Sequence, residues 1–369
     1  MLKTEAYCCQ YPACPDAGIR GSGNLILNGW SGHKREIRCL RCRTCKKCFS
    51  ERKGTVLEQS RLSSAKSTSL MEHLREGCGV RGTARMVKVA PNTVTRYARI
   101  AGEHSKKLHD ELVACSALTK EVQLDEKWSF VYKKQAHCEE NEKERGDNWD
   151  HVAIDPEHRL LLCVVSGKRT AENCRKVVED VKKRTNGRTD IFITSDEHAP
   201  YEPAIKEAYS QEEKQSDDSR KSVIPNDLCY ATVRKTRKAG RVIEIVQKLI
   251  FGEHLFLLMY LWSSLVSNTI NTSIIERYNA TDRNQNARKA RKTLRFSKDW
   301  QVHNSMTSYV AYSYNFCWPV RTLRIKTNSG KWKSRTPAMS AGLADHVWTT
   351  LEWISYPACL LYTSDAADE

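Results

Sequence analysis

The chain has 369 residues, enough for two or three domains with sizeable cores. Its 60 lysines and arginines outnumber 44 aspartates and glutamates, so the net charge is +16, which points to a polyanionic partner. The start of the chain lacks an apolar signal-peptide core. The longest apolar run, 255–267, is too short for a membrane-spanning helix. We therefore expect no membrane partner and a cytoplasmic location.

Cysteines are concentrated near the beginning of the sequence. Seven of the 15 fall within the first 48 residues, which indicates metal binding in a reducing compartment rather than a disulfide scaffold. A zinc ribbon needs two pairs of thiolates on tight turns, and the pairs Cys9 with Cys14 and Cys42 with Cys45 meet this requirement. The sequence thus predicts a Zn²⁺-binding ribbon domain over residues 1–58. Three further thiols leave the exact ligand set open: Cys8, Cys39 and Cys48.

Residues 66–115 have the pattern of a helix-turn-helix domain. Its second helix is expected to begin at Pro91, since proline suits a first helical turn. Val94, Tyr97 and Ala98 fall on the face expected in the core. The other face is expected to reach a DNA major groove through Asn92, Thr93, Thr95, Arg96 and Arg99. Lys88 stands where such turns often carry glycine, which predicts a distorted turn, and an ordinary helical pair is the alternative.

Three carboxylates stand at positions that can converge. Asp125 lies in an alternating strand pattern, and Asp196 follows the apolar run 191–193. Glu276 lies at the edge of the apolar face of a helix predicted over 271–286, where a solvated Glu–Arg pair is the alternative interpretation. Strand ends and a flanking helix meet at one edge of an α/β sheet. Three carboxylates there need a divalent cation, and oxygen ligands suit Mg²⁺ or Mn²⁺.

The segments around these residues predict an α/β domain. A charged loop over 138–150 is followed by a hairpin of HVAID and RLLLCVVSG, then by helices over 170–184 and 201–209. Asp155 is a rival first carboxylate, but the turn residues after it favour a structural role. A flexible insertion is expected over 210–227 and a basic loop over 234–238. A helix over 300–318 completes the domain.

Three blocks resemble the catalytic blocks of the IS-one family of insertion-sequence transposases: LDEKWSFVYKK, ITSDEHAPYEPAI and NTSIIERYNATDRNQNARKARKTLRFSK. The ribbon segment Arg41–Glu51 also resembles that family, as do YNFCWP and RTPAMSAGLADHVWTTLEW. For the last two we expect packing rather than catalysis. The resemblance implies a ribonuclease-H-like mixed sheet with flanking helices over residues 120–355. It also implies a DDE enzyme in which Asp125, Asp196 and Glu276 are catalytic and hold Mg²⁺.

The same resemblance implies a function on double-stranded DNA. A transposase binds the terminal inverted repeats of its insertion sequence, cleaves the ends and joins the 3′-hydroxyls to target DNA by two-metal phosphoryl transfer. Such a protein works on the prokaryotic nucleoid, and we expect a homo-oligomer where two ends are bridged. A dense run of basic residues is expected to hold the DNA backbone: Arg283, Arg288, Lys289, Arg291, Lys292 and Arg295.

Two alternatives remain at this point. One is a non-catalytic DNA-binding regulator that uses only the ribbon and the helix-turn-helix. The other is a ribonuclease-H-like nuclease that hydrolyses DNA but does not join it. The segment 359–369, CLLYTSDAADE, reads as a translated sequencing-library adapter, so we exclude it from the fold prediction.

Overall fold

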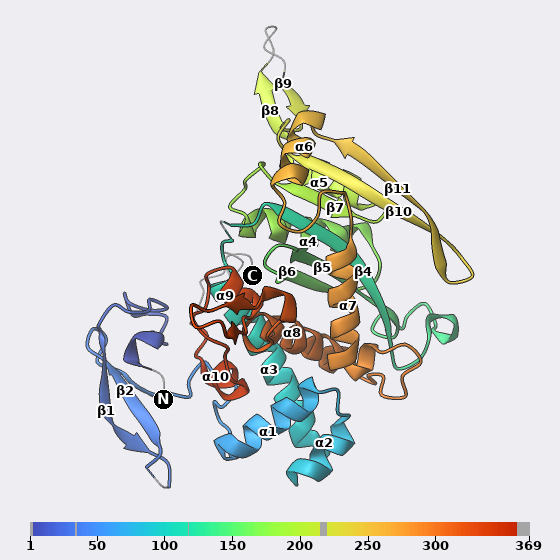
Figure 1. Cartoon of the computed structure of the whole chain (residues 1–369). Coiled ribbons are helices and arrows are strands. Elements are labelled where there is room, and N and C mark those ends of the chain that lie inside the picture. Colours follow the sequence, from blue (N-terminus) through green and yellow to red (C-terminus); the bar gives the residue numbers. More distant parts are fainter. Residues whose placement is uncertain (1–2, 34, 117, 215–219, 360–369) are drawn as a thin grey trace.

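The computed structural model describes residues 3–33, 35–116, 118–214 and 220–359. Three parts follow one another along the chain: a small three-stranded sheet, a group of helices, and a six-stranded sheet covered by helices (Figure 1). The C-terminal segment returns to the first two parts. Within the described residues, no helix combines the length and the apolar character that crossing a membrane requires.

The first sheet follows a short 3-10 helix, η1 (Thr4–Ala6), and contains β1 (Leu25–Ser31), β2 (Ile37–Cys42) and β3 (Cys48–Ser50). The three strands pair antiparallel in that order. Their core is small, with the buried side chains Tyr7, Leu25, Leu40, Phe49, Cys9, Cys14 and Cys42. A core of this size buries little apolar surface, so a crosslink within it adds substantially to its stability.

Three helices come next: α1 (Ser64–Arg75), α2 (Val80–Val87) and α3 (Pro91–Leu112). Pro91 starts α3, as predicted, and Val94, Tyr97 and Ala98 are buried, which confirms the predicted core face. Lys88 ends α2 in the left-handed conformation with φ 58° and ψ 57°. This conformation favours glycine, but the turn forms here with lysine at that position.

The large sheet contains six strands: β4 (Glu121–Val131), β5 (Gly146–Asp155), β6 (Leu160–Gly167), β7 (Phe192–Ser195), β10 (Cys229–Lys238) and β11 (Arg241–Phe251). Their spatial order is β11-β10-β7-β4-β5-β6. The three central strands β10, β7 and β4 are parallel, and the outer pairs are antiparallel. This mixed sheet with flanking helices is compatible with a ribonuclease-H-like fold.

Helices cover both faces of this sheet (Figure 1). One face carries α4 (Ala171–Arg184) and α5 (Tyr201–Tyr209), and the other carries α7 (Ser273–Gln285) and α8 (Trp300–Cys317). The long helix α3 packs along α8, so the helical part and the sheet share one hydrophobic core. The predicted order of strand, hairpin, helix, strand and helix from β4 to α5 is confirmed.

One more helix, α6, and several short elements complete the described part of the chain. Helix α6 (His254–Ser263) packs beside β10 and β11 through Leu257. The short elements are η2 (Gln135–His137), β8 (Gln211–Lys214), β9 (Arg220–Val223), η3 (Ala287–Lys289), η4 (Arg321–Leu323), β12 (Ile325–Lys326), β13 (Trp332–Lys333), α9 (Pro337–Ser340) and α10 (Thr350–Ser355).

Three predicted loops differ from the structure. The basic run 234–238 is not a loop, because it forms the end of β10 and pairs with β11. The charged segment 138–150 becomes strand from Gly146 onward, where it pairs with β4. In 210–227, the described residues include the β8–β9 hairpin, while 215–219 lie outside the described residues.

The C-terminal segment is anchored on the first sheet. Ala358 donates a backbone hydrogen bond to Gly54, and Cys359 is buried and disulfide-bonded to Cys8. Residue 359, which was excluded from the fold prediction, is therefore packed: its sulfur is bonded to Cys8, and its backbone N–H donates to Glu111. The remainder of the suspected adapter, 360–369, lies outside the described residues.

Candidate active site

Asp125 lies in β4, and Asp196 follows directly after the end of the neighbouring parallel strand β7. The β4–β7 ladder ends with the pair Gln123 and Thr194, so Asp125 and Asp196 each lie two residues beyond its last pair, and their charges interact. Burial raises the pKa of Asp125 to about 7, with further contributions from the negative charges of Asp196 and Glu126. Burial and the charge of Glu126 also raise the pKa of Asp196. The two carboxylates thus form a partly desolvated acidic pair.

Helix α7 carries Glu276 and begins directly beside β4. The buried Gln123 side chain accepts hydrogen bonds from the backbone N–H groups of Ile274 and Ile275 at 3.1 and 3.0 Å. It also donates to the carbonyl of Asn271 at 3.0 Å. These bonds satisfy N–H groups that the first helical turn leaves free. Glu276 is therefore held one turn from the strand that bears Asp125.

Every second residue of β4 from Gln123 to Lys127 is polar and contacts α7. Gln123 contacts the start of the helix, Asp125 accepts a hydrogen bond from Asn279 at 2.7 Å, and Lys127 forms an ion pair with Asp282. Successive odd-numbered strand residues point to one face, and their helix partners lie about one turn apart. Three contacts therefore fix the register between the strand and the helix.

A cleft of about 460 Å³ joins two of the three carboxylates. Asp196 and Glu276 line it, whereas Asp125 is not one of its lining residues. The remaining lining residues include three cations, Arg169, Arg234 and Lys235. Lys235 forms an ion pair with Glu276, which also accepts a hydrogen bond from Thr272 Oγ1 at 2.8 Å. Cations that line a cleft can bind the oxygens of a phosphodiester, and the carboxylates beside them can hold divalent cations.

The three carboxylates do not form one compact ligand group. Asp125, Asp196 and Glu276 are not among the groups of described residues whose potential metal-ligand atoms all lie within 4.8 Å of one another. Two-metal sites place ions about 4 Å apart, so each carboxylate need not reach the same ion. The donor set of oxygens and the raised pKa of Asp125 both fit divalent cations, which would relieve the mutual repulsion.

The residues predicted to read DNA lie on the first turns of α3. Asn92 and Arg96 are exposed, whereas Thr93, Thr95 and Arg99 are half-buried. Arg99 forms an ion pair with Asp299 at 3.0 Å, and Arg96 donates to the carbonyl of Gln59 at 3.3 Å.

The predicted basic run begins at Arg283 in α7 and continues into the segment between α7 and α8, and its members differ in exposure. Arg291, Lys292 and Arg295 are exposed. Arg283 is half-buried, and burial lowers its pKa. Arg295 also donates to the Gly77 carbonyl in the α1–α2 turn at 2.9 Å, which links this segment to the helical part.

Arg288 and Lys289 do not fit the predicted DNA surface. Both are buried, and burial lowers their pKa values to about 10 and about 8. Lys289 forms an ion pair with Asp150, which also lies 3.3 Å from Lys127. The prediction failed because a lysine in a basic run was assumed to be solvated, whereas this one neutralises a carboxylate in the core.

Several residues of the site were missed from the sequence. Gln123, Lys127 and Asn279 connect β4 to α7, and the signal was available, because polar residues occupy every second position from 123 to 129. Asp155 has the structural role that was expected. It is buried and accepts hydrogen bonds from Thr119 Oγ1 and from the backbone N–H groups of Glu157 and His158.

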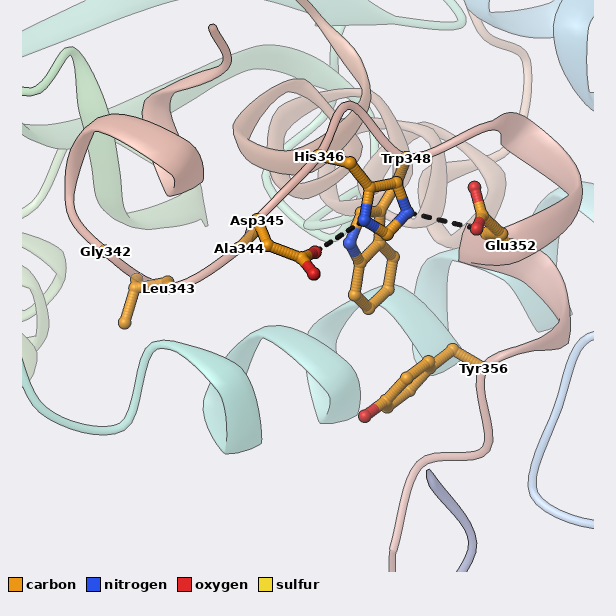
Figure 2. Close-up of a pocket in the computed structure, with 8 residues that line it drawn as sticks. All are labelled: Gly342, Leu343, Ala344, Asp345, His346, Trp348, Glu352 and Tyr356. Atoms are coloured by element: carbon orange, nitrogen blue, oxygen red, sulfur yellow. Dashed lines mark hydrogen bonds and ion pairs between the residues drawn. The ribbon is translucent and has the colours of Figure 1, made fainter. Parts of the chain in front are cut away.

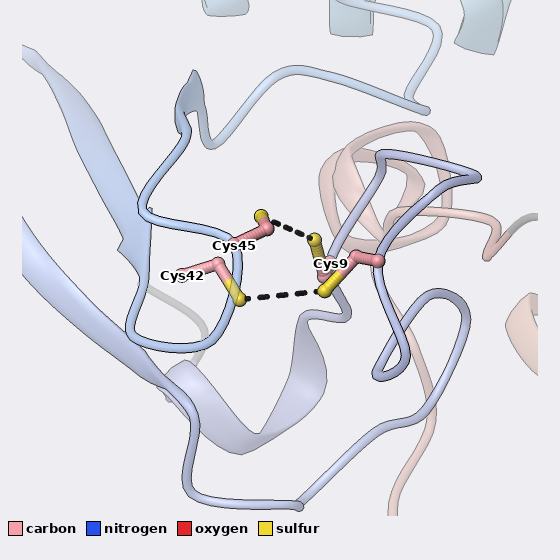
Figure 3. A group of neighbouring side chains, drawn as sticks. Cys9, Cys42 and Cys45 are labelled. Carbon is pink, nitrogen blue, oxygen red and sulfur yellow. Dashed lines mark hydrogen bonds between the residues drawn. The ribbon is translucent and has the colours of Figure 1, made fainter.

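The four cysteines predicted as zinc ligands come together in the first part of the chain. Figure 3 shows the side chains of Cys9, Cys42 and Cys45 gathered between two turns, and the fourth member is Cys14. The Cys9–Cys45 and Cys14–Cys42 sulfur distances are 3.7 and 3.8 Å. A tetrahedral site with metal–sulfur bonds of about 2.3 Å has sulfur–sulfur edges of about 3.8 Å. The spacing fits Zn²⁺.

The thiols outside this cluster have other surroundings. Cys8 is disulfide-bonded, Cys48 is exposed and Cys39 is half-buried. Within the cluster, burial acts to raise the pKa of Cys42, but hydrogen bonds from the backbone of Cys45 and Thr44 lower it to about 7. Backbone N–H groups that stabilise a thiolate favour metal binding there.

A separate cavity of about 440 Å³ lies in the C-terminal segment and contains none of the predicted site residues. Figure 2 shows His346 between Asp345 and Glu352, with Trp348 and Tyr356 beside it. The neighbouring Trp353 is fully buried, and its indole donates to Ser105 Oγ at 3.0 Å. These contacts support the expected packing role of this segment.

Comparisons with known proteins give weak similarities. No protein-family model matches the chain, and no curated protein matches it. Among solved structures, the Mos1 strand transfer complex is similar over 40% of this chain and 55% of that chain, with 13% identity and a TM-score of 0.17. The Mos1 mariner paired-end complex with Mn is similar over 40% of this chain and 56% of that chain, with 13% identity and a TM-score of 0.17. A pre-cleavage Mos1 transpososome is similar over 69% of this chain and 77% of that chain, with 9% identity and a TM-score of 0.19. The chain thus spans little more than half the length of the first two, and TM-scores this low do not establish a common fold.

Proposed function

We propose that this chain is a DDE transposase that cleaves the ends of an insertion sequence and joins the 3′-hydroxyls to target DNA. The observation that supports the proposal is that Asp125 and Asp196 lie close enough for their charges to interact, while Asp196 and Glu276 line the same cleft. These three residues would hold two Mg²⁺ or Mn²⁺ ions, and ions bound there would activate the attacking oxygen and stabilise both oxygens of an in-line displacement.

The other residues of the cleft would place the DNA strand. Arg169, Arg234 and Lys235 lie on its wall and can bind non-bridging phosphate oxygens. Lys235 pairs with Glu276 in the structure, so the binding of DNA and metal would separate the pair. The docking of α7 on β4 would keep Glu276 in position during this exchange.

DNA outside the cleft would meet two further surfaces. The exposed residues of the basic run, Arg291, Lys292 and Arg295, would neutralise backbone phosphates, and Arg283 lies beside them. The first turns of α3 would read the terminal repeats through Asn92, Thr93, Thr95, Arg96 and Arg99. We propose domain limits of 1–58, 66–115 and 120–355 for the ribbon, the helix-turn-helix and the catalytic domain.

The zinc cluster would stabilise the first of these domains. Thiolate–zinc bonds contribute to the folding free energy of small ribbons. The core around β1–β3 is small, so it alone would stabilise this domain only weakly. The assignment to the IS-one family is part of the same proposal, and so is a homo-oligomer that bridges two ends.

A strand-cleavage and joining assay tests this function. The substrate is a plasmid that carries the coding region with its flanking inverted repeats, incubated with the purified full chain and Mg²⁺. The proposal expects nicks at the repeat ends and covalent joining to a second DNA. Binding without nicks would instead identify a DNA-binding regulator, and nicks without joining would identify a nuclease.

A further inference from the structure

A second cluster of metal-ligating side chains lies close to the carboxylate pair. Glu126 comes from β4, Cys174 from α4, and His198 from the turn between β7 and α5. Their ligand atoms all lie within 4.8 Å of one another. Glu126 and Cys174 are buried, and His198 is half-buried. Because neighbouring strand residues face opposite sides of a sheet, Glu126 points away from the Asp125 side toward α4.

Two atoms of this cluster are buried without a hydrogen-bond partner in the described residues. They are Glu126 Oε1 and His198 Nε2, and the buried Tyr201 hydroxyl, which interacts with Glu126, likewise lacks a partner within hydrogen-bond distance. Arg169 donates to the other carboxylate oxygen, Oε2, at 2.9 Å, and His198 Nε2 lies 3.9 Å from that oxygen, too far for a hydrogen bond. A buried polar atom left unsatisfied costs about 1–3 kcal/mol, and native structures contain few of them.

One cation would satisfy both atoms at once. A carboxylate oxygen, an imidazole nitrogen and a thiolate sulfur form a mixed ligand set that suits Zn²⁺, whereas Mg²⁺ avoids sulfur. Glu126 and the thiolate supply two negative charges, which match a divalent ion even with Arg169 nearby. We propose that Glu126, Cys174 and His198 bind a divalent transition-metal ion of the zinc class, separate from the catalytic cations and from the four-cysteine cluster.

Binding requires loss of the thiol proton. Burial raises the pKa of Cys174 to about 12, so the thiol is protonated at neutral pH until a cation arrives. The sulfur–metal bond forms as the sulfur–hydrogen bond breaks, and the proton goes to solvent. No oxidation or reduction is involved.

The position of the ion gives it a structural task. Glu126 follows Asp125 in the chain, and the backbone N–H of His198 donates to Asp196 Oδ1 at 3.1 Å. An ion bound to Glu126, Cys174 and His198 would therefore connect β4, α4 and the β7–α5 turn just behind the two carboxylates. Its ligands act as positioning residues, and its presence can be measured without any assay of DNA cleavage.

Zinc content of the purified full chain tests the site. We expect about two Zn²⁺ ions per chain, one in the four-cysteine cluster and one here. Cys174→Ala and His198→Asn should each lower the content by about one ion. Cys163→Ala is the matched control, because Cys163 is also a fully buried thiol of this domain but lies outside the cluster, and it should keep both ions.

A variant that lacks the four-cysteine site allows the second site to be measured by itself. In the double variant Cys42→Ser/Cys45→Ser, about one Zn²⁺ should remain, and adding His198→Asn should remove it. Loading that double variant with Co²⁺ should give a thiolate charge-transfer absorption that Cys174→Ala abolishes. Equal zinc content in the wild type, Cys174→Ala and His198→Asn would overturn the proposal. If Cys174→Ala does not fold, His198→Asn is sufficient as a test, because His198 is only half-buried. Unchanged zinc content in His198→Asn would then overturn the proposal.

Discussion

Asn279 donates a hydrogen bond from its side-chain nitrogen to Asp125 Oδ2 at 2.7 Å. The helix that carries Glu276 thus holds the carboxylate of β4 directly. This bond lowers the pKa of Asp125 against the larger effect of burial, which raises it to about 7. The geometry and the protonation of the acidic pair therefore depend on how α7 docks.

Removing this donor should shift the pH profile of cleavage. In Asn279→Leu, the pKa of Asp125 rises further, and we expect about a tenfold loss of cleavage near neutral pH, since a lost hydrogen bond of about 1.4 kcal/mol corresponds to that factor. Activity should recover partly in alkaline buffer. Asn284→Leu, an exposed position on the same helix, is the control. A uniform loss at every pH would instead indicate a purely structural role.

The affinity for divalent cations should rise with pH over the range in which Asp125 loses its proton. An unfolded aspartate titrates near pH 4, whereas the folded one titrates near pH 7. The raised pKa stabilises the metal-free fold below pH 4, and this stabilisation is lost as the pH rises to about 7. Cations compete with the proton, so calorimetry with Mn²⁺ should show tighter binding at about pH 8 than at about pH 5. Equal affinities at both values would refute this assignment of Asp125.

Much of the fold follows from periodicity in the sequence. The order of elements from β4 to α5 could be read in this way, and so could the places of Asp125 in a strand, Asp196 just after a strand and Glu276 on a helix. The pairing of α7 with β4 could not, because the contact between Gln123 and Ile275 depends on tertiary docking. The run 234–238 looked like a loop because it is charged, yet cross-strand pairing with β11 makes it a strand. The burial of Lys289 depends on Asp150, which is distant in sequence.

Two neighbouring lysines should separate stability from DNA binding. Lys289→Met leaves Asp150 with an incomplete set of partners in the core, and we expect a loss of about 3–5 kcal/mol in unfolding free energy. Lys292→Met, at an exposed position, should change stability by less than about 0.5 kcal/mol. It should instead make the plot of the logarithm of the DNA-binding constant against the logarithm of the salt concentration less steep by about one unit. Denaturant titration and binding isotherms at several salt concentrations measure both; the reverse pattern would show that Lys289 contacts DNA.

The first turns of α3 and the exposed basic run should affect DNA binding differently. Arg96→Ala should reduce discrimination between the repeat ends and unrelated DNA, since base contacts carry sequence information. Arg291→Ala should weaken binding to both DNAs alike. Competition binding with a repeat end and a scrambled duplex distinguishes them. Identical effects of the two changes would show that the division into a reading helix and a backbone-binding segment is wrong.

The most direct test of the catalytic assignment is the rate of Mg²⁺-dependent strand cleavage in four single variants, each checked for folding and DNA binding. Asp125→Asn, Asp196→Asn and Glu276→Gln should each lower the rate by about a thousandfold or more, because metal ligation stabilises the transition state by several kcal/mol. Glu197→Gln, which changes another carboxylate on the same cleft, should cleave at nearly the wild-type rate. Near-normal cleavage by any of the first three, or an equal loss in Glu197→Gln, would contradict the assignment of these carboxylates as the metal-binding catalytic set.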